Sequence, residues 1–220
     1  MTDEKTIVLA TRNPGKLREL ARILGAEEPG GTQVRLAGLD EFPGATDVPE
    51  TGATFEENAL LKARAIAACT GLPAVADDSG LCVDALGGAP GVQSAVYAPY
   101  APPAATEREA QRRAQDAANN VLLLERLAGS ADRRASFVCA LVALRVADDP
   151  EPLIAFGRWH GEILTAPQGE GGFGYDPLMF IPALGATVAT LPAATKNAQS
   201  HRAIAAAQML ALMRDAWHLS

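Results

Sequence analysis

The residues best suited to chemistry are two adjacent aspartates, Asp77 and Asp78, followed by Ser79 and Gly80. They come directly after Pro73–Ala76, an apolar run that predicts a short strand with the acidic pair at its end. Carboxylate oxygens suit Mg²⁺, and a bound metal could activate water and neutralise a phosphate leaving group. The same four residues are also ordinary for an Asx turn, so the motif alone leaves a purely structural role open.

A second polar segment, Thr11–Lys16 (TRNPGK), follows the apolar run Thr6–Ala10 and precedes a helical pattern of leucines. Asn13 suits a helix cap and Pro14 suits the first helical turn. Free amides at a helix start, together with Lys16, could bind an anion. The glycine-rich Walker pattern is absent, and a capped helix with a solvated lysine is the alternative.

A third segment, Gly169–Pro177, places four glycines around Phe173 and Tyr175. Glycines let a backbone approach a flat ligand, on which either ring could stack, while Asp176 could accept hydrogen bonds from ring N–H groups. The alternative is a loop whose aromatic side chains fold back onto the core.

The fourth segment, Lys196–Arg202, collects two cations and His201 at the start of the predicted helix Ser200–Trp217, for which Ser200 is the expected cap. The helix dipole disfavours cations at this end, so the arrangement indicates a bound anion. Solvation of these side chains would reduce the conflict and is the other interpretation.

The rest of the sequence predicts the helices and strands that position these four segments. A T-x-x-E capping box at Thr54 and Glu57 predicts a helix that ends at Gly71, and a second box at Thr106 predicts one that ends near Gly129. Strands are predicted at Thr6–Ala10, Pro73–Ala76, Phe137–Val146, Ile154–Ile163 and Met179–Ile181. Alternating helices and strands favour an α/β fold with a mixed sheet, and Phe137–Val146 is apolar enough to be covered on both faces.

Composition narrows the function classes. The 220 residues carry a net charge of −7, which argues against nucleic acid and anionic membranes as partners. The three cysteines are far apart and favour neither disulfides nor a zinc site. The first residues lack the pattern of a signal peptide, and no apolar run is long enough to span a bilayer, so a cytoplasmic location is expected.

Taken together, the four segments resemble the inosine triphosphate pyrophosphatase family, purine nucleoside-triphosphate pyrophosphatases that clear deaminated nucleotides. The matching stretches run in the family's order from Leu9 to Arg202 and are ATRNPGKLREL, ETGATFEENALLKARA, PAVADDSGLCVDALGGAPGVQSAVYA, GGFGYDPLMFIP and KNAQSHRA. One such stretch would be weak, but five in order are specific.

The resemblance implies a single domain over residues 1–220, built on an elongated mixed sheet with flanking helices and two lobes with the active-site cleft between them. It implies Mg²⁺-dependent hydrolysis of ITP, dITP and XTP to the nucleoside monophosphate and pyrophosphate, by a homodimer.

Carried over residue by residue, the resemblance makes Asp78 the catalytic proton acceptor and a metal ligand, and it alone selects Asp78 over Asp77. Glu50 is the expected second metal ligand, with Glu56 and Glu57 close by as alternatives. The substrate-binding residues it implies are Thr11, Arg12, Asn13, Pro14, Gly15, Lys16, Ser79, Phe173, Gly174, Tyr175, Asp176, Lys196, His201 and Arg202.

Two other functions fit part of the pattern. A pyrophosphatase for modified pyrimidine nucleotides would share the phosphate-handling residues but not the purine pocket. A non-catalytic nucleotide sensor would use the same anion-binding loops. The Asp77-Asp78 pair argues against a sensor, because carboxylates repel a triphosphate unless a metal is present.

Overall fold

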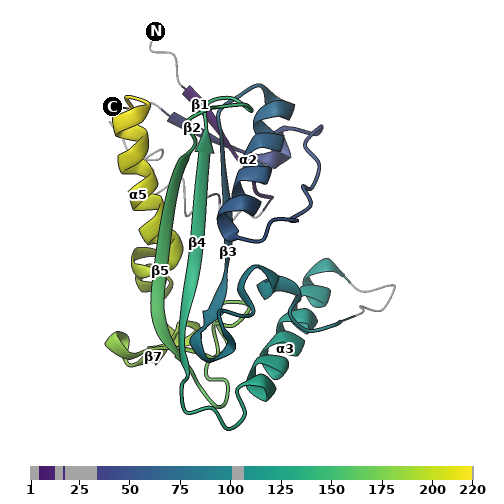
Figure 1. The fold of residues 1–220 in the computed structure, drawn as a ribbon, viewed down its shortest axis with the longest axis vertical. Helices are drawn as coiled ribbons and strands as arrows, with labels where there is room; N and C mark the ends of the chain where they lie inside the picture. Colours follow the sequence, from purple (N-terminus) through teal and green to yellow (C-terminus); the bar gives the residue numbers. More distant parts are fainter. Residues whose placement is uncertain (1–4, 13–16, 18–33, 101–106, 220) are drawn as a thin grey trace. The chain divides into compact units, whose positions relative to one another are not determined.

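The computed structural model describes residues 5–12, 17, 34–100 and 107–219, and a seven-stranded mixed sheet runs through them (Figure 1). Its strands lie in the order β2-β1-β3-β4-β5-β6-β7. They are β1 (Lys5–Leu9), β2 (Val34–Gly38), β3 (Ala74–Val83), β4 (Arg134–Leu144), β5 (Leu153–Ile163), β6 (Met179–Ile181) and β7 (Ala186–Thr187). Strand β1 is parallel to β2 and β3, whereas β6 is antiparallel to β5 and β7. The predicted mixed sheet is confirmed.

The helices flank this sheet. They are α2 (Phe55–Thr70), α3 (Arg108–Arg126), α4 (Ala193–Gln199) and α5 (His201–Ala216). The Thr54 hydroxyl accepts a hydrogen bond from the Glu57 amide at 3.1 Å, and the Glu57 carboxylate accepts one from the Ala53 amide. Gly71 ends α2 with a left-handed φ of 67°. Both predicted ends of α2 are therefore confirmed.

The chain divides into two compact units. The first comprises Met1–Ser79, Cys139–Gly157 and Ser200–Ser220, and the second comprises Gly80–Val138 and Arg158–Gln199. Strands β3, β4 and β5 each continue from one unit into the other, so the chain crosses between the units several times. Within the described ranges, none of the helices combines the length and apolarity needed to cross a bilayer.

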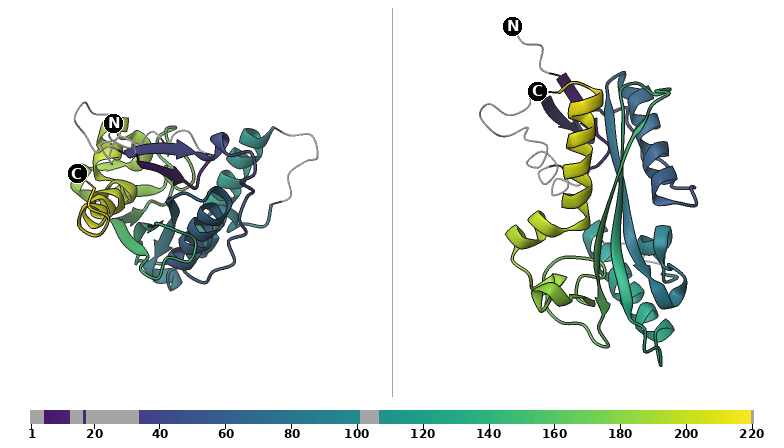
Figure 2. Two further views of the ribbon diagram at one scale, coloured as in Figure 1. Left: turned by 90° about the horizontal axis from the view of Figure 1, so that it is seen from above. Right: turned by 60° about the vertical axis from the view of Figure 1, so that its left-hand side comes forward.

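The core of the first unit is built on both faces of β4. Cys139, Leu141 and Ala143 pack in a cluster with α5, whereas Val142 and Leu144 pack with α2. The right-hand view of Figure 2 shows α5 and α2 on opposite faces of the sheet. This explains the continuous apolar run in the sequence, since a strand covered on both faces has no solvent side.

The core of the second unit lies beneath α3. Leu123 and Leu127 of α3 are fully buried and belong to one cluster with Phe137 of β4, Trp159 of β5 and Met179 of β6. The same cluster includes buried residues from the glycine-rich segment, so α3 and that segment share one core.

Several details differ from the sequence-based expectation or concern residues that the structure does not describe. Strands β2 and β7 are not among the five strands predicted from the sequence. Strand β3 does not end before the acidic pair: Asp77–Gly80 lie inside it, because Leu81 and Val83 continue the buried apolar pattern. A separate short helix, α4, precedes α5. The N-cap residue of α3 is Glu107, which makes no side-chain capping hydrogen bond, and not the predicted Thr106, which itself lies outside the described residues. Most of the helix predicted after Asn13 also lies outside them.

The turn between β4 and β5 contains a buried aspartate whose contribution to stability can be measured. Asp149 is buried and accepts hydrogen bonds from the Arg145 guanidinium and from the Arg145 and Glu151 amides, at 2.8–3.0 Å. The Arg145 hydrogen bonds hold the pKa of Asp149 well below its usual range. We expect Asp149→Ala to lower the free energy of unfolding by about 1–2 kcal/mol at neutral pH, because two backbone donors lose their acceptor.

Urea titrations of the parent protein, of Asp149→Ala and of the exposed control Asp148→Ala measure this. Because folding depresses the pKa of Asp149, its contribution is complete at neutral pH and is lost as pH falls below the ordinary value of 3.8. The difference between the parent and Asp149→Ala should therefore shrink in acid. A constant difference down to pH 2 would contradict the ionic part of this account.

Candidate active site

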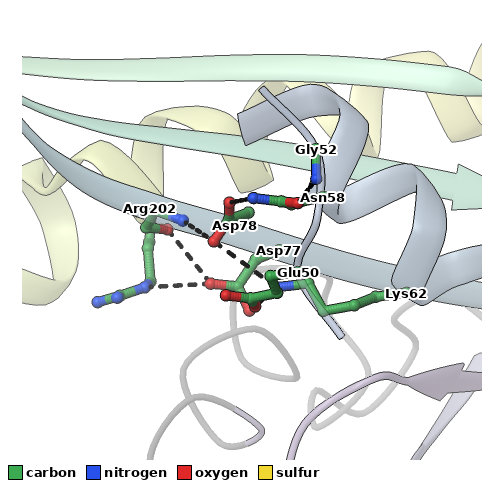
Figure 3. Close-up of polar contacts among 8 residues, drawn as sticks. Glu50, Gly52, Asn58, Lys62, Asp77, Asp78 and Arg202 are labelled. Carbon is green, nitrogen blue, oxygen red and sulfur yellow. Dashed lines mark hydrogen bonds and ion pairs between the residues drawn. The ribbon is translucent and has the colours of Figure 1, made fainter. Parts of the chain in front are cut away.

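Asp77 and Asp78 lie in the first unit, and the pleat of β3 directs them to different partners. Successive side chains of a strand point to opposite faces. Asp78 contacts Asn58 and Lys62 of α2, whereas Asp77 lies 3.6 Å from Nε of Arg202 in α5. Each carboxylate is therefore met by a polar side chain from the helix on its own side (Figure 3).

Asp78 is held by the first turns of α2. The Asn58 side-chain amide donates to Oδ2 of Asp78 at 3.0 Å, and the Lys62 ammonium lies 3.6 Å from Oδ1. Asn58 and Lys62 are four residues apart, so they lie on one face of the helix. The Ser79 amide donates to Oδ1 of Asp78 at 3.0 Å.

Glu50 meets the same lysine. The Lys62 ammonium donates to Oε1 of Glu50 at 2.6 Å, so one cation contacts both of the carboxylates expected to bind metal. Mg²⁺ commonly uses one or two carboxylates together with water and substrate phosphates. Across the described ranges there is no group of three or more acidic, histidine or cysteine side chains that could hold a metal. Glu50 and Asp78 together supply two carboxylates.

The pKa values of the cluster follow from burial and charge. Burial raises the pKa of Asp78, although the Lys62 charge and the Asn58 hydrogen bond oppose this shift. Burial works to lower the pKa of Lys62, but the charges of Asp78, Asp77 and Glu50 and the hydrogen bond to Glu50 outweigh it, so the pKa is raised. The charged form of Lys62 is therefore favoured, and the affinity of Asp78 for a proton is increased.

Asn58 also fixes the loop that carries Glu50. Its side-chain oxygen accepts a hydrogen bond from the Gly52 amide at 2.7 Å, while its amide nitrogen bonds Asp78. A Cβ at Gly52 would lie 2.7 Å from Cβ of Glu57, so only glycine permits this approach. Sequence reasoning missed Asn58 and Lys62. The available signal was two polar residues at helical spacing beside the alanines of the buried face of α2.

The start of α5 is held close to β5. The Ser200 hydroxyl accepts a hydrogen bond from the Ala203 amide at 3.2 Å, as predicted for the cap. A Cβ at Gly157 would lie 1.8 Å from the His201 carbonyl oxygen, so glycine is required where the helix crosses the strand. His201 and Arg202 are both buried as a result. Lys196, from the same sequence segment, belongs to the second unit instead.

In the second unit, Lys196 joins the glycine-rich segment. It forms an ion pair with the buried carboxylate of Asp176, and its ammonium lies 4.8 Å from the centroid of the Phe173 ring. The Asp176 carboxylate also accepts a hydrogen bond from the Phe173 amide at 3.0 Å. The Phe173 side chain is 43% exposed. The exposed Phe173 ring therefore lies beside the Lys196–Asp176 ion pair.

Tyr175 has a different environment from Phe173. It is buried, and its hydroxyl donates to the Ser94 carbonyl oxygen at 2.9 Å. Burial raises the pKa of Tyr175. Of the two rings that could stack on a flat ligand, Phe173 is the one open to solvent, whereas Tyr175 is part of the core.

The first polar segment is only partly described. The Arg12 guanidinium donates to the Ala45 carbonyl oxygen and lies 3.5 Å from Asp40 and 3.7 Å from Asp47. Its charge is thus partly compensated within the chain. Asn13, Pro14, Gly15 and Lys16 lie outside the described residues, so their anion-binding role stays a prediction.

The mixed sheet and its buried carboxylates, paired with lysine and arginine, define an α/β protein with a site suited to acid–base chemistry on a charged ligand. The sequence matches the model of the Ham1 family over residues 7–212, and the chain belongs to that family.

Relatives and solved structures agree over nearly the full length. The chain is 63% identical to a dITP/XTP pyrophosphatase of Methylibium petroleiphilum, covering 96% of this chain and 98% of the relative. It is 54% identical to one of Burkholderia pseudomallei, covering 95% and 93%. A HAM1 protein from Coxiella burnetii has a similar structure, with a TM-score of 0.83, 42% identity and coverage of 96% and 100%.

The contacts of Asn58 with Asp78 and Gly52 can be tested without a substrate. We expect Asn58→Ala to raise the pKa of Asp78 further, because a hydrogen bond that favours the ionised form is lost. We also expect a lower melting temperature, because the buried Gly52 contact is lost. Carboxyl ¹³C NMR titration and thermal unfolding measure both, with the exposed α2 variant Arg64→Ala as control. An unchanged Asp78 titration would contradict the proposed contact.

Proposed function

We propose that this protein hydrolyses the non-standard purine nucleotides ITP, dITP and XTP to nucleoside monophosphates and pyrophosphate. This activity would cleanse the nucleotide pool and prevent misincorporation into DNA and RNA. One observation carries the proposal: Asp78 and Glu50 converge on Lys62 in a chain 63% identical to a protein named dITP/XTP pyrophosphatase.

The chemistry assigned to the first unit is proton transfer and phosphate handling. Hydrolysis of a phosphoanhydride depends mainly on positioning and on neutralising charge. Asp78 would accept the proton of the attacking water, for which its raised pKa is suited. Lys62 holds Asp78 and Glu50 together and offers a cation to phosphate oxygens. When bound, Mg²⁺ would be held by Asp78 and Glu50 and would neutralise charge on the phosphates.

The second unit is proposed to receive the base. Phe173 offers an exposed ring for stacking, and the Asp176 carboxylate is an acceptor for base N–H groups. Lys196 compensates that carboxylate in the absence of ligand. The remaining assigned substrate contacts, which stay predictions, are Thr11, Arg12, Asn13, Pro14, Gly15, Lys16, Ser79, Gly174, Tyr175, His201 and Arg202.

The two alternative functions make different demands on the site. A sensor that only binds a nucleoside triphosphate does not need the two buried carboxylates of β3. A pyrimidine-specific enzyme would need a different base pocket, and the names of the relatives favour purines. A homodimer and a cytoplasmic location complete the proposal; light scattering on the purified protein measures the first.

The proposal predicts metal-dependent release of pyrophosphate. We expect the protein to liberate pyrophosphate from ITP and XTP with Mg²⁺, and ATP, GTP, CTP and UTP to be much poorer substrates. A coupled pyrophosphate assay over these six nucleotides, with and without excess EDTA, measures this. Release of orthophosphate alone, or full activity in EDTA, would sink the assignment, whereas preference for a pyrimidine would support the first alternative.

The proposal also predicts the effect of replacing Asp78. We expect Asp78→Asn to lower kcat for ITP by at least ~10²–10⁴-fold, because the proton acceptor and a metal-binding charge are both lost. The matched control is Asp84→Asn, a change of an exposed aspartate in the second unit. If folded Asp78→Asn turned over normally while Asp77→Asn did not, the catalytic role would pass to Asp77.

A further inference from the structure

Helix α3 forms hydrogen bonds with the turn that carries Phe173. The Gly174 amide donates to Oδ2 of Asp116 at 2.9 Å, and the Gly174 carbonyl oxygen accepts from the Asn120 side-chain amide at 2.9 Å. Both polar backbone atoms of one residue are thus held by side chains four positions apart on α3. Two directed hydrogen bonds to a single peptide segment fix its orientation as well as its position.

The same stripe of α3 reaches the aromatic ring. Arg112 lies four positions before Asp116, and its guanidinium carbon is 5.3 Å from the centroid of the Phe173 ring. A cation at this distance is attracted to the ring by its quadrupole. Residues at i, i+4 and i+8 share one helical face, so Arg112, Asp116 and Asn120 form a continuous row along the turn.

The turn needs such external support. Gly174 has a left-handed φ of 60°, and the turn's own hydrogen bonds are the Phe173 amide to Asp176 and the Asp176 amide to the Phe173 carbonyl, at 3.0 and 3.2 Å. A glycine can adopt several backbone conformations at little cost. The α3 contacts therefore add to these local bonds and to the Lys196 contact in fixing the direction of the half-exposed ring.

We propose that the row Arg112, Asp116 and Asn120 is a positioning device that orients the Phe173 ring for the base of the nucleotide. This inference rests on the proposed function and adds to it residues that determine base affinity by orienting the aromatic turn. The row belongs to the second unit and contacts the aromatic turn, whereas the Asp78 cluster belongs to the first. Its loss should therefore weaken binding of the nucleotide more than the hydrolytic step.

The test is steady-state kinetics of pyrophosphate release from ITP. We expect Asp116→Ala to raise KM by about tenfold, the size expected for one lost hydrogen bond to a backbone amide, with kcat within about twofold of the parent. Asp116→Asn keeps an oxygen acceptor for the Gly174 amide and should restore most of the KM. Arg112→Ala should raise KM by a smaller factor of about two to five.

Arg113→Ala is the matched control, because Arg113 lies on α3 in an exposed ion pair with Glu109. If Asp116→Ala proves unstable in thermal unfolding, Asn120→Ala removes the other hydrogen bond to Gly174 and carries the same expectation. A fall in kcat with unchanged KM, or failure of Asp116→Asn to restore KM, would overturn the inference. Absence of pyrophosphate release by the parent protein would instead overturn the proposed function.

Discussion

The burial of two adjacent carboxylates inside β3 is the constraint on which the first unit depends. A charge removed from water costs several kcal/mol unless it is paired and hydrogen-bonded. Asp78 meets this demand through Asn58 and Lys62, and Asp77 through Arg202. The fold therefore brings polar side chains from both flanking helices to the centre of an otherwise apolar strand.

This arrangement explains why α2 and α5 carry polar residues on faces that pack against the sheet. Asn58 is almost fully buried beside Ala59 and Ala63, which pack against β3 and β4. It is tolerated there because both ends of its amide are bonded, to Gly52 and to Asp78. Removing Asn58 would cost Asp78 and the Gly52 amide one partner each, so stability and the environment of Asp78 are coupled in this cluster.

The second unit buries one aromatic ring of the glycine-rich segment and leaves the other partly exposed. Its core takes Tyr175, whose hydroxyl is satisfied by Ser94, and leaves Phe173 half-exposed. The turn between these residues contains glycine and is contacted from two helices: Asp116 and Asn120 of α3 bond Gly174, and Lys196 of α4 pairs with Asp176.

The sequence by itself determined the elements whose signals are local. The cap at Thr54, the left-handed end at Gly71, the cap at Ser200 and the doubly apolar β4 depend on neighbouring residues in the chain, and all are confirmed. Residue types alone singled out the carboxylate pair and the aromatic turn, and the family resemblance, carried by five short stretches, selected Asp78 over Asp77. Strand β3 was predicted too short, because polar residues inside a strand look like its end.

Only the tertiary structure decided the partners. That Lys62 joins Glu50 to Asp78, that Arg202 faces Asp77, and that Asp116 and Asn120 hold Gly174 are contacts between residues 12 to 125 positions apart. The structure also decides which of the two aromatic rings is buried. Tyr175 is part of the core and Phe173 is not, and a sequence pattern of two aromatic residues does not show this choice. Such choices depend on packing between distant elements, and no local pattern of residue types records that packing.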